Sequence, residues 1–194
     1  WAGANAAGSA GGRGAHVTVL DTNVQRLRQL GGHFEGRGHT AASNPFDLDR
    51  AVIESDLVIG SVLIPGARAP KLVTNDMVAR MRPGSVLVDI AVDQGGCFAD
   101  TRPTTHADPT FVVHGSVFYC VANMPGAVPN TSTSALTNAT LPYVRAIARD
   151  GWRAALTADP ALALGLNTSA GAVVNAGVAA AHGLTAVTFA DALA

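Results

Sequence analysis

Two apolar runs, DLVIGSVL at residues 56–63 and SVLVDIA at residues 85–91, decide the fold of this chain. Both runs are nearly continuous, which is typical of strands that are covered on both faces of a sheet. Between them, residues 74–81 have a helical pattern, and Pro83-Gly84 then ends the helix. A strand, a helix and a second strand joined by short turns form a βαβ unit. We therefore expect an α/β protein with a mostly parallel sheet.

The same alternation continues on both sides of this unit. A β-branched run at residues 16–20 predicts a strand, and residues 24–30 carry apolar side chains at helical spacing. Pro45 is well placed to begin a helix that ends near Glu54, and residues 111–121 form a third apolar run. The residues placed to cap the helices at their start are Asn44 and either Thr74 or Asn75.

The character of the sequence changes after Pro129. Residues 131–148 are Ala-rich with helical periodicity, and residues 155–181 hold more helical material. This part has few bulky apolar residues, so it cannot bury much of a core by itself. We expect two domains, one at residues 1–129 with the sheet and one at residues 130–194 with helices that pack on another surface of the protein.

Composition excludes several classes of protein. The 194 residues carry 13 Lys+Arg against 14 Asp+Glu, so there is no broad basic face for nucleic acid. No run of about 18 uncharged apolar residues indicates a membrane span. Cys97 and Cys120 do not make a disulfide framework and fit a reducing, cytoplasmic location. The six histidines lack metal-ligand spacing, so we expect no metal site.

The opening of the chain is rich in glycine. It starts with Trp1 rather than an initiator Met, and glycines recur up to Gly14. We interpret the chain as a fragment in which the first strand and the start of a glycine motif are missing. Gly8, Gly11 and Gly12 would each cost about 1 kcal/mol relative to Ala inside a helix. We therefore expect the first helix to be distorted or short.

Gly3 and Asp21 have the spacing of a dinucleotide-binding motif. In that motif the last glycine leads into a helix N-terminus that receives the pyrophosphate, and an acidic residue about 20 positions later binds the ribose hydroxyls. Asp21 follows Gly3 by 18 positions and comes directly after a predicted strand. The pattern indicates a Rossmann-type doubly wound parallel sheet that binds NAD rather than NADP, because a carboxylate repels a 2′-phosphate. Alternatively, Asp21 only caps the next helix, and Arg26 either faces the adenosine or is solvated.

Two polar side chains follow predicted strands where ligands bind in open α/β sheets. Asp93 comes just after the run at residues 85–91, and the glycines that follow it leave the backbone room to approach a ligand. Asn123 follows the third run, where it offers an amide to a ligand or serves only as a turn residue before Pro125. Asp89 lies within its strand, and we interpret it as structural, satisfied by N–H groups of a neighbouring loop.

Six longer segments form a recognisable set. They are residues 56–73, 81–98, 102–105, 118–125, 131–140 and 151–155. Together they resemble alanine dehydrogenase, in the family that also contains the nicotinamide nucleotide transhydrogenases. The similarity runs through nearly the whole chain and is weak only at residues 8–14 and at the C-terminal end.

The resemblance implies an enzyme. Alanine dehydrogenases interconvert L-alanine with pyruvate and ammonia, use NAD, and form homo-oligomers, here expected to be hexamers. Their Rossmann domain is inserted into a substrate domain. This chain would be the C-terminal half, with residues 130–194 returning to the substrate domain. The other catalytic groups of the family, a His and a Lys with a substrate-binding Arg, belong to the N-terminal half.

The resemblance also assigns site residues. Asp93 would be the catalytic acid/base, and Asn123 would lie near the substrate. The cofactor-binding residues would be Ala2, Gly3, Asp21, Arg26, Ser43, Val62, Leu63, Ile90, Ala91, Val92, Asp93, Arg102, Val121, Ala122, Asn123 and Met124.

Two other interpretations remain open at this level. The chain could be a non-catalytic NAD(H)-binding module like the transhydrogenase domain. It could also be a 2-hydroxyacid dehydrogenase, because that class shares the kind of segment found at residues 81–88. The second alternative is disfavoured because those enzymes need a catalytic His and Arg at other spacings.

Overall fold

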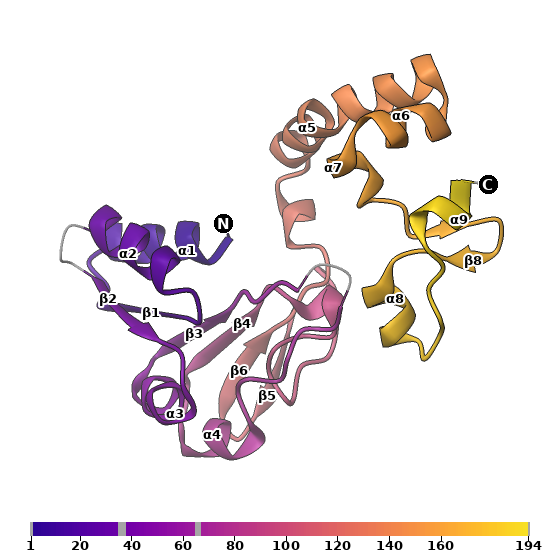
Figure 1. Ribbon diagram of the computed structural model, residues 1–194. Coiled ribbons are helices and arrows are strands. Elements are labelled where there is room, and N and C mark those ends of the chain that lie inside the picture. The colour runs from indigo at the N-terminus through magenta and orange to yellow at the C-terminus, as the bar shows by residue number, and fades with distance from the viewer. Residues whose placement is uncertain (1, 35–37, 65–66, 194) are drawn as a thin grey trace. The chain divides into compact units, whose positions relative to one another are not determined.

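The computed structural model describes residues 2–34, 38–64 and 67–193. The chain divides into two compact units, which are described separately. The first, called the sheet unit, contains residues 1–63 and 69–124. The second, called the helical unit, contains residues 64–68 and 125–194. Figure 1 draws the sheet unit from indigo to magenta and most of the helical unit from orange to yellow.

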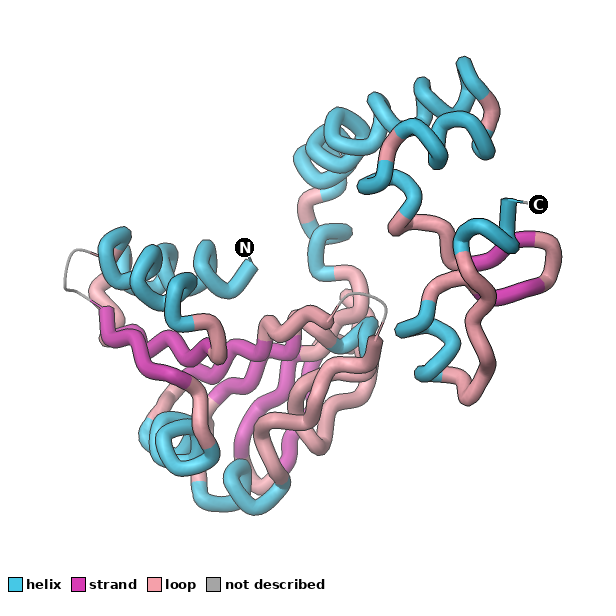
Figure 2. The backbone as a smooth tube through the Cα atoms, in the orientation of Figure 1, coloured by secondary structure: helices cyan, strands magenta, loops and turns pink. Residues whose placement is uncertain are grey.

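The described strands of the sheet unit form two sheets (Figure 2). In the first, β1 pairs in parallel with β2. The second has the order β3-β4-β6-β5, in which β3, β4 and β6 are parallel and the edge strand β5 is antiparallel to β6. The strands are β1 Val17–Asp21, β2 Gly38–Ala42, β3 Leu57–Gly60, β4 Val86–Asp89, β5 Thr110–Val113 and β6 Ser116–Tyr119. The expected α/β fold with a mostly parallel sheet is therefore confirmed.

The third apolar run differs in detail from a single strand. It forms the β5–β6 hairpin, whose turn contains His114 with φ 50° and Gly115 with φ 82°. Positive φ at both central positions is the requirement of a type I′ hairpin turn, whose twist matches that of the flanking strands. The turn places β5 antiparallel to β6, where β5 forms the edge strand of the sheet.

Four helices of the sheet unit follow the expected pattern. They are α1 Ala2–Gly12, α2 Val24–His33, α3 Pro45–Glu54 and α4 Asn75–Arg80. The side chain of Asn44 accepts a hydrogen bond from the Asp47 N–H, and that of Thr74 accepts one from the Met77 N–H. Each bond satisfies a donor that the first turn of a helix leaves unpaired. The predicted start of α3 is confirmed, and Thr74 rather than Asn75 is the cap of α4.

The expectation that the glycine-rich first helix is distorted or short is wrong. α1 is continuous for 11 residues. It ends at Gly12 and is followed by Gly14, where φ is 86°. There the Ala15 N–H donates to the Ala10 carbonyl and the Gly14 N–H to the Gly11 carbonyl. This arrangement is a Schellman motif, which satisfies the last helical carbonyls. Ala7 packs into a small apolar cluster with Leu30 and Phe34, and such tertiary packing outweighs a poor helix propensity.

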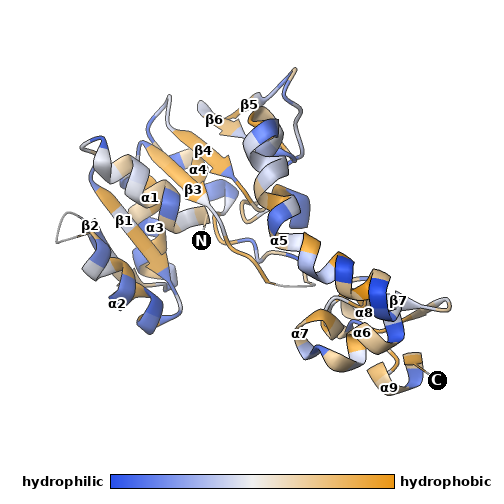
Figure 3. Ribbon diagram, turned by 90° about the horizontal axis from the view of Figure 1, so that it is seen from above, coloured by the Kyte–Doolittle hydropathy of each residue, from blue (hydrophilic) through white to orange (hydrophobic). Residues whose placement is uncertain are grey.

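The main core lies around the four-stranded sheet. Its largest fully buried side chains include Leu87 on β4, Phe118 on β6 and Phe98 on the loop after β4. The rings of Phe98 and Phe118 pack edge to face with centroids 6.1 Å apart. Figure 3 shows the hydrophobic character of β3 and β4 as continuous orange. β4 alternates between partly and fully buried residues, so both of its faces are at least partly covered, whereas β3 begins at the exposed Leu57.

β1 is an edge strand of the first sheet and β3 is an edge strand of the second. Neither is hydrogen-bonded on its open side to another described strand. α1 contacts both β1 and β3, so it covers the place where the sheets adjoin. In the 3-2-1-4-5-6 order of a doubly wound sheet, β2 and β1 correspond to positions 3 and 2, and β3 and β4 to positions 4 and 5.

The helical unit starts with the longest described helix. α5 Pro129–Asp150 spans 22 residues and includes Pro142 in its interior. The elements after it are α6 Trp152–Ala158, α7 Pro160–Ala163, β7 Thr168–Ser169, β8 Ala172–Val173, α8 Ala176–Ala181 and α9 Phe189–Leu193. None of the helices within residues 2–34, 38–64 and 67–193 combines the length and hydropathy needed to cross a bilayer.

The further helical material expected in residues 155–181 is present as α6, α7 and α8, but it is not continuous. The short β7–β8 hairpin interrupts it, with positive φ at Ala170 and Gly171. A glycine after alanine permits this tight turn, because Gly adopts positive φ without steric cost. The alanine content had hidden a turn of only two central residues.

Candidate cofactor and catalytic site

The predicted site residues follow the carboxyl ends of parallel strands. Asp21 ends β1 and pairs in register with Ala42 on β2, directly before Ser43. In the larger sheet, Gly60 on β3 pairs with Asp89 on β4, and Val88 pairs with Tyr119 on β6. The chain therefore leaves β3, β4 and β6 at one edge of the sheet, as open α/β folds do where they bind ligands.

Asp21 and Ser43 are brought together. The Ser43 N–H donates to the Asp21 backbone carbonyl at 2.9 Å. One carboxylate oxygen of Asp21 accepts the Asn23 N–H at 2.8 Å, and Asn23 itself caps α2 by accepting the Arg26 N–H. The alternative that Asp21 caps this helix is therefore wrong. Within the described part of the chain, no hydrogen bond is found at the second carboxylate oxygen.

Arg26 stands in the first turn of α2. Its guanidinium reaches the Gln29 side-chain oxygen at 3.5 Å, a long and weak hydrogen bond. The side chain is half-buried rather than fully solvated. Its place near Asp21 in the chain agrees with a position beside the adenosine, but its described contacts are with α2.

The N-terminus of α1 approaches the end of β3 closely. A Cβ added at Gly3 would overlap the Ser61 hydroxyl oxygen, so a larger residue there would require the Ser61 side chain to move. Close helix–strand packing is the task of the last glycine in a dinucleotide-binding motif. Ala2 and Gly3 thus lie beside the segment that leads into Val62 and the exposed Leu63. Ser61 was not predicted, because nothing in the local sequence indicates which hydroxyl meets a glycine far along the chain.

Asp93 lies on a short 3₁₀ helix, Val92–Gln94, directly after β4. Its side chain is exposed, and it forms no hydrogen bond among the described residues. Upstream of it, the Ile90 N–H continues the sheet pairing by donating to the Gly60 carbonyl at 2.8 Å. The segment from Ile90 to Asp93 therefore starts as an extension of the sheet and turns outward at Asp93.

Asp89 is fully buried beneath this loop. Its carboxylate accepts hydrogen bonds from the backbone N–H groups of Ala91 at 3.0 Å, Cys97 at 2.9 Å and Phe98 at 3.4 Å. The Thr101 hydroxyl adds a fourth at 2.5 Å. The interpretation of Asp89 as a structural residue satisfied by loop N–H groups is confirmed.

The Val121–Met124 segment leaves β6 next to β4. Val121 is bridged to Thr104, and the side chain of Asn123 is exposed. The Asn123 carbonyl is 2.7 Å from Nε2 of His106, which can only bond to it as an N–H donor. His106 was not predicted to touch this segment, because the two residues are 17 positions apart.

Arg102 is placed away from Asp93 in its described contacts. Its guanidinium lies 4.1 Å from the centre of the Phe111 ring on β5, in a cation–π contact. No described contact joins it to the loop after β4. Its assignment to the cofactor therefore stays a prediction.

The two cysteines are not nucleophiles. Burial, followed by the charge of Asp89, raises the pKa of the Cys97 thiol to about 12. The same two causes raise the pKa of the Cys120 thiol to about 11. Thiols with these pKa values stay protonated at neutral pH, and the thiolate is the reactive form. Both side chains are free and buried, which confirms that they are core residues. In the described ranges, no group of His, Cys, Asp or Glu residues could hold a metal ion.

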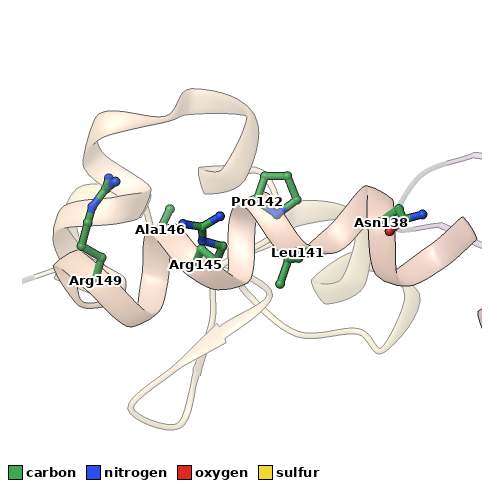
Figure 4. Close-up of a pocket in the computed structure, with 6 residues that line it drawn as sticks. All are labelled: Asn138, Leu141, Pro142, Arg145, Ala146 and Arg149. Atoms are coloured by element: carbon green, nitrogen blue, oxygen red, sulfur yellow. The ribbon is translucent and has the colours of Figure 1, made fainter. Parts of the chain in front are cut away.

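One concave surface is lined by residues of α5 alone. It is lined by Asn138, Leu141, Pro142, Arg145, Ala146 and Arg149, all on one face of the helix (Figure 4). Because Pro142 has no N–H, it cannot bond to the Asn138 carbonyl as a helical residue would. The lining itself offers two cations and no acid, and Arg149 is paired with the neighbouring Asp150 at 2.7 Å. It therefore has no constellation for acid–base chemistry.

Comparison with known proteins decides the family. The family described as "Alanine dehydrogenase/PNT, C-terminal domain" matches residues 1–176. This chain belongs to that family. The resemblance of its six segments to alanine dehydrogenase, as a C-terminal half, is thereby confirmed.

Individual relatives of the alanine dehydrogenase/PNT family agree. The chain is 61% identical over 178 residues to an alanine dehydrogenase of Mycolicibacterium smegmatis, covering 92% of this chain and 48% of the relative. It is 59% identical over 193 residues to one of Staphylococcus haemolyticus, covering 99% of this chain and 52% of the relative. The chain thus spans about half the length of the curated relatives that it matches.

Two solved structures are also similar to this chain. An L-alanine dehydrogenase structure aligns with a TM-score of 0.80 at 50% identity, covering 93% of this chain and 50% of that one. A transhydrogenase from Sinorhizobium meliloti aligns with a TM-score of 0.59 at 28% identity, covering 68% and 37%. Both similarities agree with a Rossmann-type α/β fold for this chain, and the dehydrogenase is the more similar of the two.

Proposed function

We propose that this chain is the cofactor-binding half of an NAD-dependent alanine dehydrogenase. The reaction would be the reversible oxidative deamination of L-alanine to pyruvate and ammonia. The observation that carries the proposal is the 61% identity over 92% of the chain to an enzyme of that name. The position of Asp93, exposed at the carboxyl end of a buried strand, supports it independently.

The adenosine side of the proposed site is formed by Asp21 and Ser43. A second carboxylate oxygen of Asp21 without a described partner suits the ribose hydroxyls of NAD. The N-terminus of α1 lies next to Ser61 at the end of β3, and helix N-termini bind pyrophosphate groups through their unpaired N–H groups. A carboxylate at this place favours NAD over NADP by repelling a 2′-phosphate.

The nicotinamide side is assigned to the turns after β4 and β6. NAD, when bound, accepts a hydride from the α-carbon of the substrate. Asp93 is placed to exchange protons with the reacting amine or water, and Asn123 is placed to orient the substrate. The proposed cofactor set remains Ala2, Gly3, Asp21, Arg26, Ser43, Val62, Leu63, Ile90, Ala91, Val92, Asp93, Arg102, Val121, Ala122, Asn123 and Met124.

The remainder of the protein would supply what this chain lacks. A lone carboxylate cannot also bind the substrate carboxylate, which needs a cation. We assign residues 1–129 to the NAD-binding domain and residues 130–194 to helices that return to a substrate domain. The assembled protein would be a cytoplasmic homo-oligomer, a hexamer by analogy with the family.

The alternative is a non-catalytic NAD(H)-binding module like the transhydrogenase domain. The lower TM-score of the transhydrogenase, 0.59 against 0.80, favours the dehydrogenase. Alanine-dependent NADH formation by the full-length protein distinguishes the two. The isolated 194-residue chain should bind NAD weakly and form no NADH from alanine.

The test of the catalytic assignment is Asp93→Asn in the full-length protein. We expect kcat to fall by roughly 10²- to 10⁴-fold, the usual contribution of a general acid or base, while NAD affinity changes little. Steady-state NADH formation and calorimetric NAD titration measure the two effects.

The matched control is Asp56→Asn, which removes an exposed carboxylate that precedes β3 at the opposite edge of the sheet. This variant should keep normal turnover. Near-normal turnover of Asp93→Asn would instead make Asp93 a structural residue of the strand end.

A further inference from the structure

Lys71 makes contacts that neither its sequence context nor the proposed chemistry requires. Its ammonium donates hydrogen bonds to the backbone carbonyls of Gly95 at 2.6 Å and Phe98 at 2.9 Å. Both carbonyls belong to the loop that follows Asp93. Lys71 is the single lysine in the chain, and the other basic residues are arginines.

The same loop is held from beneath by Asp89. The buried carboxylate accepts hydrogen bonds from the N–H groups of Ala91, Cys97 and Phe98, whereas Lys71 donates hydrogen bonds to carbonyls of the same loop. The loop therefore has its donors bound by an anion on one side and its acceptors bound by a cation on the other. Hydrogen bonds to charged groups are stronger than those between neutral groups.

The backbone of the Lys71 segment is fixed against the loop as well. The Ala69 N–H donates to the Gln94 carbonyl at 2.9 Å, and the Leu72 N–H to the Cys97 carbonyl at 2.8 Å. Along the loop, the carbonyls of Gln94 and Cys97, which accept from this backbone, alternate with those of Gly95 and Phe98, which accept from the Lys71 ammonium. Of the two carbonyls that Lys71 binds, that of Phe98 also accepts the Thr101 N–H at 3.3 Å, whereas that of Gly95 has no other donor among the described residues.

We propose that Lys71 and Asp89 form an ionic clamp that positions Asp93. The inference rests on the proposed function, in which Asp93 is the catalytic acid/base. The two 3₁₀-helical neighbours of Asp93, Val92 and Gln94, lie between the points where the clamp holds the loop. Lys71 and Asp89 are positioning residues, because neither is argued to touch substrate or cofactor.

The chemistry of lysine explains its use here. An ammonium is a compact point charge with three donors, so it can bind two carbonyls of one tight loop. The guanidinium of arginine is planar and wider, with its donors in a fixed fork suited to carboxylates. A single lysine among arginines is therefore the side chain that fits two carbonyls three residues apart.

The experiment uses Lys71→Met in the full-length protein. Lys71 is exposed, so its removal should leave the core intact. Because an error of about 1 Å in a reacting group can cost 10²-fold, we expect kcat to fall by about 10- to 100-fold. NAD affinity should change little, and hydrogen exchange should increase at the amides of residues 92–98 only.

The matched control is Arg82→Met. Arg82 is also an exposed cation that donates to a backbone carbonyl, that of Glu54 at 2.6 Å, but it precedes β4 at the other edge of the sheet. Its turnover and its exchange at residues 92–98 should match the wild type. Lys71→Arg should recover only part of the activity.

A double-mutant cycle with Asp93→Asn decides whether Lys71 acts through Asp93. If it does, Lys71→Met should lower kcat no further in the Asp93→Asn background, since the positioned group is already gone. Additive losses, or unchanged turnover of Lys71→Met, would overturn the clamp while leaving the proposed function intact. A wild-type protein that forms no NADH from alanine would overturn both.

Discussion

At the residue scale, the molecule uses two aspartates four positions apart in opposite ways. Asp89 points into the core and is saturated with hydrogen bonds, whereas Asp93 is exposed and forms none among the described residues. Strand alternation explains the first orientation, and the 3₁₀ turn after Ala91 explains the second. A buried charge needs such saturation, because an unpaired one is costly. An exposed carboxylate at a strand end is available for chemistry.

Asp21 provides the prediction on cofactor choice. In the full-length protein, Asp21→Ala should weaken NAD binding about tenfold or more, the value of a lost hydrogen bond to a charged group, and NADP binding should weaken less or improve. Calorimetric titration with both cofactors measures the ratio of the two dissociation constants. Asp56→Ala is the control that removes a carboxylate elsewhere, and it should keep the ratio. Equal affinities for NAD and NADP in the parent protein would contradict the assignment.

Cys97 provides a prediction on pH. Its pKa is raised to about 12 in the folded chain, against about 8.5 for a free thiol. The folded state therefore holds the thiol proton more strongly than the unfolded state, and stability falls as pH rises above about 8.5. Urea unfolding midpoints should be flat just below that pH and decline towards the folded pKa. The decline should be smaller in Cys97→Ala, and an identical decline in both proteins would refute the linkage.

At the element scale, the turn after β4 is fixed by fit as well as by charge. Gly95 and Gly96 have φ values of 93° and 72°. A Cβ at Gly96 would also overlap the Asp89 carboxylate and the Thr101 side chain. The two glycines are thus required by the backbone that lets one buried carboxylate collect the N–H groups of its own loop. This explains the Gly-Gly pair in structural terms, beside its proposed use in ligand approach.

Gly96→Ala should therefore be more damaging than an alanine at an equally twisted but open position. We expect a loss of about 2–4 kcal/mol in the free energy of unfolding, from backbone strain and overpacking together. Gly84→Ala is the control, because φ there is 87° and no atom lies within 4 Å of an added Cβ. That variant should lose about 1 kcal/mol from backbone strain alone. Equal losses in urea denaturation would show that the Asp89 contact is unimportant.

At the scale of the whole molecule, the two units differ in how completely their apolar side chains are buried. The sheet unit has a core of fully buried residues around β4 and β6. In contrast, α5 has no buried residue along its described length, and Leu136 and Val144 are 66% and 57% exposed. Helices gain most of their stability from packing an apolar face. The exposed apolar side chains of α5 are therefore suited to pack against a partner surface. The half of the curated relatives that this chain does not span would provide such a surface.

Hydrogen exchange should reveal this difference. In the isolated chain, amides of α5 should exchange rapidly, whereas those of β4 should be strongly protected. In the full-length protein, α5 should become protected, because its apolar face is then covered. The amides of β4 are the internal control and should be protected in both. Strong protection of α5 in the isolated chain would contradict the need for a partner.

The sequence by itself determined the elements and the places where strands end. Apolar runs gave β3 and β4, Asn44-Pro45 gave the start of α3, and strand-end reasoning gave Asp93 and the structural character of Asp89. These signals are local, because propensity, capping and burial pattern act over a few residues. The glycine content of α1 misled for the same reason, since propensity alone ignores the packing of Ala7.

Only the tertiary structure decided which distant residues meet. Lys71 binds carbonyls 24 and 27 positions away, and Gly3 packs against Ser61 at the end of β3. No local pattern encodes such pairs, because they depend on how strands and loops stack once the sheet has formed. The hairpin turn at Ala170 was likewise hidden by helix-forming neighbours. Sequence thus located the catalytic candidate, and only the fold brought the side chains of Lys71 and Asp89 to the loop around it.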